Sequence, residues 1–122
     1  MTARAAPYLL AAVLLAGCAP VPPPMPVPSI QTIQGKWYGQ IKFGGGPYQM
    51  LWLTVNPDAG LVMVWGSNTK WGKVLLYDGR ARFDVGTWSG TLNYYEGSEG
   101  RLLTMDADFN VFDARVKPDQ QP

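Results

Sequence analysis

The sequence predicts an all-β domain, built as a small antiparallel meander barrel or sandwich of about seven or eight short strands. Three observations support this fold class. Several stretches alternate strictly between apolar and polar residues, which is the period of a strand with one buried face. Turn-forming residues separate these stretches at short intervals. No stretch of comparable length carries apolar residues at the helical period.

The clearest strands are "KWYGQIKF" from Lys36, "RARFDV" from Arg80 and "TWSGTLNY" from Thr87. The residues expected on their buried faces are Trp37, Gly39, Ile41, Phe43, Ala81, Phe83, Val85, Trp88, Gly90, Leu92 and Tyr94. Three other runs, "YQMLWLTV", "LVMVW" and "KVLLY", are apolar without clean alternation. We interpret them as strands covered on both faces or interrupted by bulges.

Turn signals separate these runs, at residues 44–47, 56–60, 66–70, 78–79, 96–100 and 106–110. The sharpest is Asp78-Gly79, because this pair tolerates the positive φ angles of a two-residue type I′ hairpin. A meander of this length would leave exposed edges unless it closed on itself. We therefore expect a closed or nearly closed barrel.

One internal similarity links "GKWYGQIKF" from Gly35 to "GTWSGTLNY" from Gly86. Either a duplicated four-strand unit or two strands that independently need a tryptophan beside glycines would produce it. In both cases we expect Trp37 and Trp88 at equivalent core positions.

The first residues have the pattern of a secretory signal, with one positive charge at Arg4 and an apolar run from Tyr8 to Ala16. That run is too short to span a bilayer, which takes about 20 apolar residues. The end of this run and the two residues after it, Leu15, Ala16, Gly17 and Cys18, resemble the lipobox of bacterial lipoproteins. This resemblance implies that Cys18 is lipidated and becomes the first residue of the mature chain. Because Ala19 follows Cys18, the outer membrane is the expected destination; an ordinary signal peptide with an incidental cysteine is the alternative.

The expected domain organisation has four parts: a signal peptide over 1–17, a lipidated, proline-rich tether over 18–33, the β domain over 34–117 and a disordered tail over 118–122. Residues 19–29 hold six prolines and no charge, so we expect a polyproline II spacer. A proline-binding partner is an alternative use of this segment.

Composition excludes several classes of function. Loss of Arg4 with the signal would leave nine Lys and Arg against nine Asp and Glu, so a nucleic-acid partner or a polybasic membrane patch is not expected. The chain has no histidine and its only cysteine is Cys18, which removes the commonest catalytic bases, nucleophiles and metal ligands. Asp106 with Asp108, and Glu96 with Glu99, are interpreted as solvated turns. We predict a non-enzymatic protein without a cofactor or metal.

Gly35, Lys36 and Trp37 are similar to the first-strand motif of lipocalins and other calycins. In that family the tryptophan closes the base of the barrel, which is the role the resemblance implies for Trp37. The domain is shorter than a usual lipocalin, so lipid or pigment transport is not carried over.

The strongest candidate for recognition is "VWGSNTKWGK", residues 64–73. It places two aromatic residues beside a polar loop, a combination that suits the binding of sugars or peptides. The candidate binding residues are Trp65, Ser67, Asn68, Lys70 and Trp71, and the loop also contains Thr69. The structural alternative is a hairpin whose tryptophans pack across the strand pair.

Three functions follow as hypotheses. The first is an envelope lipoprotein whose β domain binds a protein or polysaccharide partner, the second a small calycin-like ligand-binding barrel, and the third a periplasmic inhibitor of a secreted hydrolase. A cavity inside the barrel would favour the second, and exposed tryptophans over a filled core the first.

Replacement of Cys18 by serine tests the lipid anchor. Because serine lacks the thiol that takes the lipid, the Cys18→Ser chain should lose the lipid-dependent partitioning with membranes and should no longer run at the mature size. Cell fractionation and immunoblotting measure both effects. Membrane partitioning at the original mature size would contradict the prediction.

Overall fold

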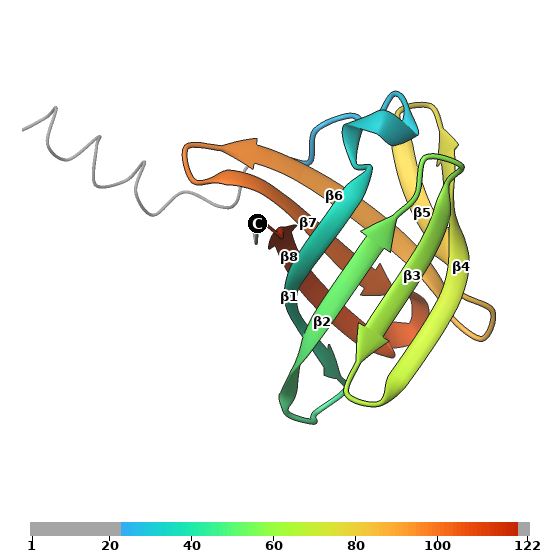
Figure 1. The fold of residues 1–122 in the computed structure, drawn as a ribbon, viewed down its shortest axis with the longest axis vertical. Helices are drawn as coiled ribbons and strands as arrows, with labels where there is room; N and C mark the ends of the chain where they lie inside the picture. Colours follow the sequence, from blue (N-terminus) through green and yellow to red (C-terminus); the bar gives the residue numbers. More distant parts are fainter. Residues whose placement is uncertain (1–22, 120–122) are drawn as a thin grey trace, which may run out of the picture.

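The computed structural model describes residues 23–119 and confirms the all-β fold class (Figure 1). Eight antiparallel strands follow one another around a closed barrel, in which β8 returns to pair with β1. The strands are β1 (Gly35–Phe43), β2 (Tyr48–Val55), β3 (Gly60–Trp65), β4 (Asn68–Tyr77), β5 (Arg80–Asp84), β6 (Ser89–Gly97), β7 (Gly100–Ala107) and β8 (Phe112–Pro118). Two short 3-10 helices, η1 (Ile30–Thr32) and η2 (Asp108–Asn110), mark opposite ends, called here the η1 end and the η2 end. The predicted signal peptide and Cys18 lie outside the described residues.

Side chains from all eight strands fill the barrel. An eight-stranded cylinder is only wide enough for its own inward-facing side chains or one small ligand. Of the residues predicted to face inward, Trp37, Ile41, Ala81, Phe83, Val85, Leu92 and Tyr94 are buried, together with others such as Leu53, Met63 and Met105. No polar or charged residue between 23 and 119 is buried, so the interior offers an apolar filling and nothing to orient a polar ligand.

The η1 end is closed by Trp37 and the cation that stacks on it. The indole Nε1 of Trp37 donates a hydrogen bond to the carbonyl of Ile33, at 2.9 Å. The Arg101 guanidinium lies 5.0 Å from the centre of the Trp37 ring and donates to the carbonyl of Thr32 and the hydroxyl of Tyr94. Burial raises the pKa of Tyr94, as does its hydrogen bond to the Glu96 carboxylate, while Arg101 acts in the opposite direction. This cluster ties η1 to β1, β6 and β7.

An aromatic cluster closes the η2 end. Phe43, Trp65, Trp88 and Phe112 pack with ring centroids 5.3 to 6.2 Å apart. The Lys70 ammonium lies 5.3 Å from the centre of the Trp88 ring and caps this cluster from β4.

The expected equivalence of Trp37 and Trp88 is wrong. Trp37 lies near the start of β1 at the η1 end, whereas Trp88 directly precedes β6 at the η2 end and is only half-buried. The two similar segments belong to β1 and β6, which are five strands apart. Because consecutive strands of a meander run in opposite directions, β1 and β6 are antiparallel and begin at opposite ends of the barrel. A duplicated four-strand unit would relate β1 to β5 instead. The similarity therefore reflects two strands that each need glycine beside tryptophan.

The need for glycine is visible at three inward-facing positions. A Cβ at Gly39 would lie 1.9 Å from the Arg115 carbonyl oxygen of β8, one at Gly72 2.0 Å from the Asp84 oxygen of β5, and one at Gly90 2.2 Å from the Asp106 oxygen of β7. These distances are far below van der Waals contact, so the neighbouring strand can approach only because the side chain is missing. Gly39 lies at the β1–β8 pairing, Gly72 at the β4–β5 pairing and Gly90 at the β6–β7 pairing. Strands β1–β4 and β5–β8 are called here the β1–β4 wall and the β5–β8 wall.

The predicted turns fall between the observed strands. Asp78 and Gly79 both have positive φ, 54° and 74°, as the type I′ prediction requires. The connection between Trp65 and Asn68 is shorter than predicted, because only Gly66 and Ser67 separate β3 from β4.

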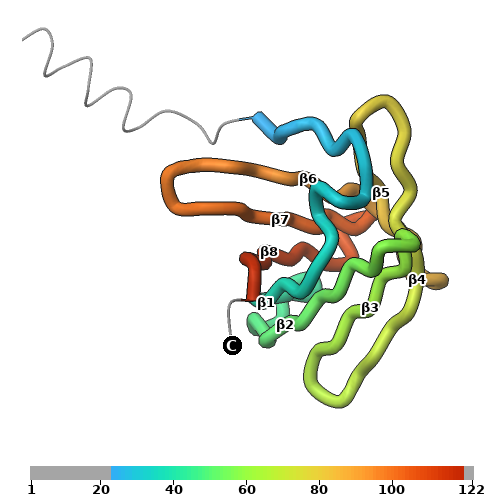
Figure 2. Tube along the Cα trace, turned by 45° about the horizontal axis from the view of Figure 1, so that its top comes forward, coloured from blue at the N-terminus to red at the C-terminus, as the bar shows by residue number. Residues whose placement is uncertain are grey.

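The proline-rich segment differs from a free spacer along its second half. Met25 and Val27 alternate with prolines, so their backbone N–H groups are the donors of this stretch. Met25 N donates to the Tyr94 carbonyl at 2.6 Å, and Val27 N donates to the Gly79 carbonyl at 2.7 Å. The β6–β7 hairpin extends past β5, and this segment lies along its exposed β6 edge (Figure 2). Val27 and Ile33 are buried in the core. The expected tether thus joins the barrel from Met25 onward.

The chain's last described residues also pack on the barrel. Pro118 belongs to β8, and the Asp119 backbone N–H donates to the Lys36 carbonyl at 2.9 Å. The predicted disordered tail therefore does not begin at 118; residues 120–122 lie outside the described range. Within 23–119 no helix is long and apolar enough to cross a membrane.

Glycine-to-alanine substitutions test the close strand approaches. Gly39→Ala, Gly72→Ala and Gly90→Ala should each destabilise the barrel by several kcal/mol or prevent folding, because the added methyl overlaps backbone that cannot move aside. Gly45→Ala is the matched control, since its Cβ meets nothing within 4 Å. Urea unfolding compares the variants. A mild effect at all three positions would contradict the proposed close approach.

Candidate functional site

The three apolar runs without clean alternation explain the most unusual surface of the molecule. One set of their side chains is buried, as in β2, where Leu51, Leu53 and Val55 face inward. The other set faces solvent and is not covered within residues 23–119: Trp52 is 45% exposed and Tyr77 52% exposed. Trp71, two residues before the third run, is 70% exposed. The prediction that these strands are covered on both faces is therefore wrong for the chain alone. A barrel has one inner face, and the outer apolar residues have no layer above them.

Several of these outward residues, together with Tyr38 and Trp71, form a patch on the β1–β4 wall, called here the aromatic face. Strand register places Tyr38 beside Trp52, Trp52 beside Val64, and Val62 beside Trp71. The rings of Tyr38 and Trp52 are in contact, with centroids 5.0 Å apart. The aromatic face consists of Tyr38, Met50, Trp52, Val62, Val64 and Trp71. Strands β2, β3 and β4, which carry most of it, lie side by side at the front of Figure 1.

The four strands of the β1–β4 wall carry charges of one sign, while Asp58 lies in the turn between β2 and β3. These strands, all within the described range, contain Lys36, Lys42, Lys70 and Lys73 but no Asp or Glu. Lys36, Lys42 and Lys73 alternate with the buried positions and so point outward beside the aromatic face. The Lys42 ammonium also lies 5.3 Å from the centre of the exposed Tyr48 ring. Asp113 on β8 lies opposite Lys42, and Asp84 on β5 lies opposite Lys73, so acidic side chains border the face where the two walls meet.

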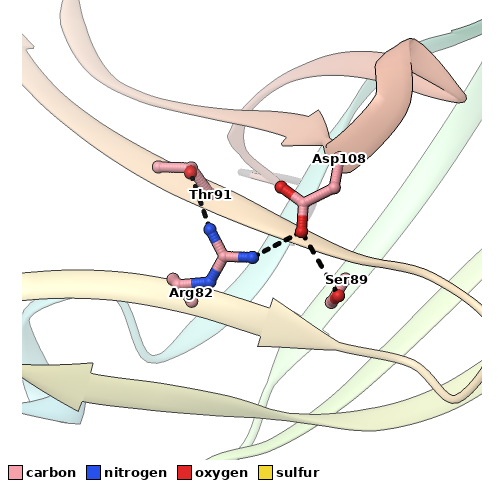
Figure 3. A network of polar contacts seen from close by, with 4 residues as sticks. All are labelled: Arg82, Ser89, Thr91 and Asp108. Atoms are coloured by element: carbon pink, nitrogen blue, oxygen red, sulfur yellow. Dashed lines mark hydrogen bonds and ion pairs between the residues drawn. The ribbon is translucent and has the colours of Figure 1, made fainter.

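The β5–β8 wall has a different surface. Its strands carry acidic and basic side chains together, among them Asp84, Asp106, Asp113, Arg80 and Arg115. A polar network joins β5, β6 and η2 (Figure 3): Arg82 forms an ion pair with Asp108 at 2.6 Å and donates to Thr91, while Ser89 donates to the same Asp108 oxygen. These groups satisfy one another, and the network fixes η2 on the wall.

The structure separates the two tryptophans of the predicted recognition loop. Trp65 is 5% exposed and lies in the aromatic cluster at the η2 end, whereas Trp71 points outward from β4. They do not flank one binding surface, nor do they pack across the strand pair, because Trp65 pairs with Asn68 and Trp71 with Val62. Of the five predicted residues, Trp71 alone lies on the aromatic face.

The polar members of that prediction lie near the hairpin turn. Ser67 and Asn68 are exposed at the turn itself. Lys70 reaches inward over Trp88 and its ammonium is 3.5 Å from the Thr87 hydroxyl. Lys70 thus caps the η2 end and does not extend toward Trp71.

The carboxylates interpreted as solvated turns mostly lie on strands. Asp106 is on β7 and accepts a hydrogen bond from Asn93, and Glu96 is on β6 and accepts one from Tyr94. Glu99 lies in the two-residue turn between β6 and β7. Residues 23–119 contain no group of three His, Cys, Asp or Glu placed to hold a metal ion.

Two surface hollows lie away from the aromatic face. One, of about 480 Å³, lies between the proline-rich segment and β5 and β6, and is lined by Met25, Arg80 and Asn93 among others. The second, of about 460 Å³, lies at the η1 end beside Arg101 and Lys117. Both lie outside the filled barrel, and neither includes a residue of the aromatic face.

Sequence reasoning missed Tyr38, Met50 and Trp52. The sequence did contain a pattern that could have identified them. Tyr38 falls on the outward face of the alternating β1 pattern, and Met50 and Trp52, two positions apart in β2, lie on the same face of that strand. Alternation in sequence assigns the residues of a strand to two faces. When both faces are apolar, alternation does not show which one faces the core.

The chain has no match among family models, curated proteins or solved structures. Function is therefore inferred from the surface of the barrel.

Tryptophan substitutions distinguish the core from the aromatic face. Trp65→Ala should lower the free energy of unfolding by about 3 to 5 kcal/mol, because it removes a large buried side chain. Trp71→Ala should change it by about 0.5 kcal/mol or less, since the side chain is mostly in solvent. Urea unfolding measures both. Equal costs would show that Trp71 is not an exposed residue.

Proposed function

We propose that this protein is a lipid-anchored lipoprotein of the bacterial cell envelope whose barrel acts by binding a partner through the aromatic face. The observation that carries the proposal is the outward patch of Tyr38, Met50, Trp52 and Trp71 on the outside of the barrel. Monomeric proteins rarely leave a large contiguous apolar patch exposed, and such patches commonly mark interaction sites. Trp and Tyr are also the residues most enriched at binding hot spots.

The sequence supports the anchor and the location. Leu15, Ala16, Gly17 and Cys18 match the lipobox pattern after an apolar signal run, and Ala19 favours the outer membrane. The chain lacks histidine, and its single cysteine is the residue proposed to carry lipid, which supports a non-enzymatic role. The partner is an envelope protein or polysaccharide.

The calycin-like alternative has less support. The place of Trp37 at the closed η1 end agrees with what the Gly35-Lys36-Trp37 resemblance implies. A ligand inside the barrel would, however, have to displace packed apolar side chains and would find no buried polar group to orient it. Recognition on the outside of the barrel requires no such rearrangement.

Site-specific crosslinking in intact cells tests the binding face. A photocrosslinking residue at Thr69, which register places beside Val64, should form adducts. The same residue at Thr104 on β7 is the control, because it reports on the β5–β8 wall. Combining the Thr69 probe with Trp52→Ala and Trp71→Ala should reduce the adducts at least tenfold, since the aromatic anchors are removed. Equal adducts at both positions, or adducts that persist without the two tryptophans, would refute the proposed face.

A further inference from the structure

We infer that residues 23–28, called here the strap, close an open strand edge of the barrel and keep a second copy of the chain from pairing with it. The inference concerns self-association and does not depend on what binds the aromatic face. A strand edge with unpaired N–H and C=O groups is a template for pairing with another chain, and native proteins cover or interrupt such edges.

The open edge belongs to β6. The pairing of β5 with β6 ends at Leu92, whereas β6 continues to Gly97 and stays paired with β7 over that length. Within the eight strands, residues 93–97 of β6 therefore have a neighbour on one side only. The strap lies along the other side, beside the β6–β7 hairpin (Figure 2).

The strap is held at two points on the two sides of this gap. The Met25 N–H bonds the Tyr94 carbonyl on β6, and the Val27 N–H bonds the Gly79 carbonyl in the turn between β4 and β5. The Val27 side chain is 2% exposed and belongs to the hydrophobic core. The strap thus occupies the place of a further strand next to β6.

The strap has no backbone donor left for another chain. Within residues 23–28 the four positions besides Met25 and Val27 are prolines, which have no N–H group. Both N–H groups that the strap does have are bonded to the barrel. Facing residues of an antiparallel ladder exchange N–H···O bonds in both directions, so a strand laid on the outer side of the strap would find acceptors only.

The alternation of the sequence produces this one-sided edge. Met25 and Val27 are two positions apart and both donate toward the barrel, so Pro24, Pro26 and Pro28 stand where an N–H would face solvent. This is the position at a sheet edge where proline costs no ladder hydrogen bond. Two copies of the chain cannot pair strap to strap, because neither copy donates.

The first test restores the outward donors. Pro24→Ala with Pro26→Ala and Pro28→Ala keeps the donors of Met25 and Val27 and adds an N–H group at each outward position. The full chain is purified in an excess of non-ionic detergent, and sedimentation velocity measures its self-association over a range of concentrations. The variant should self-associate with a dissociation constant lower than that of the unaltered chain by about tenfold or more. Far-UV circular dichroism checks that the fold is retained.

The second test releases the strap. Met25→Pro with Val27→Pro removes both donors and should expose the β6 edge, with a similar gain in self-association. Glu96, two positions after Tyr94 on β6, directs its N–H toward the same open side. Adding Glu96→Pro removes this donor and should return self-association to that of the unaltered chain. Glu96→Ala is the matched control, because it removes the same side chain but keeps the N–H, and it should leave the gain in place.

Three results would overturn the inference. The first is a triple alanine variant that associates no more than the unaltered chain; this variant decides alone if the double proline variant does not fold. The second is association of the released chain that Glu96→Pro leaves unchanged, because the contact would then lie on another edge, such as β2 before its pairing with β3 begins at Trp52. The third is association that Trp52→Ala with Trp71→Ala abolishes, which would assign the contact to the aromatic face. Crosslinking at Thr69 is independent of all three, so the two proposals can fail separately.

Discussion

Eight antiparallel strands close into a cylinder that their own side chains fill, and the rest of the molecule depends on this limited interior. Trp37, stacked by Arg101, blocks the η1 end, and the ring cluster around Phe43 blocks the other. With the inside occupied by apolar groups, polar recognition can take place only on the outer walls or at the rims. The exposed tryptophans of β2 and β4 lie on one of these outer walls.

The two walls differ in the side chains that they direct outward. The strand backbones approach closely at Gly39 and Gly72, where the two walls meet, because no side chain separates them. The strands between these positions carry lysines and large apolar groups outward, whereas β5 to β8 carry charges of both signs. One wall is thus typical of a solvated surface, and the other has the composition of a contact surface.

Parts of the fold and site were predictable because they depend on neighbouring residues. The positive φ angles at Asp78 and Gly79 follow from residue type, and the inward set of β5 follows from its alternation. Trp71 was identified as a candidate, but Trp65 was joined to it through proximity in sequence. Trp65 and Trp71 are six residues apart on the two strands of one hairpin. Whether each side chain faces the core or solvent depends on which set of alternate residues in its own strand is buried.

The sequence alone determined that the chain forms short antiparallel strands, where most of them turn, and that its first residues resemble a lipoprotein signal. These properties are local, because each depends on residue type and on spacing over a few positions. Only the tertiary structure decided which apolar face of β2, β3 and β4 became core, that Trp37 and Trp88 close opposite ends, and that Met25 and Val27 pair with the barrel. Each of these depends on strands distant in the sequence: the outer face of β2 is exposed because closure uses its inner face, and Met25 finds a partner because β6 extends beyond β5.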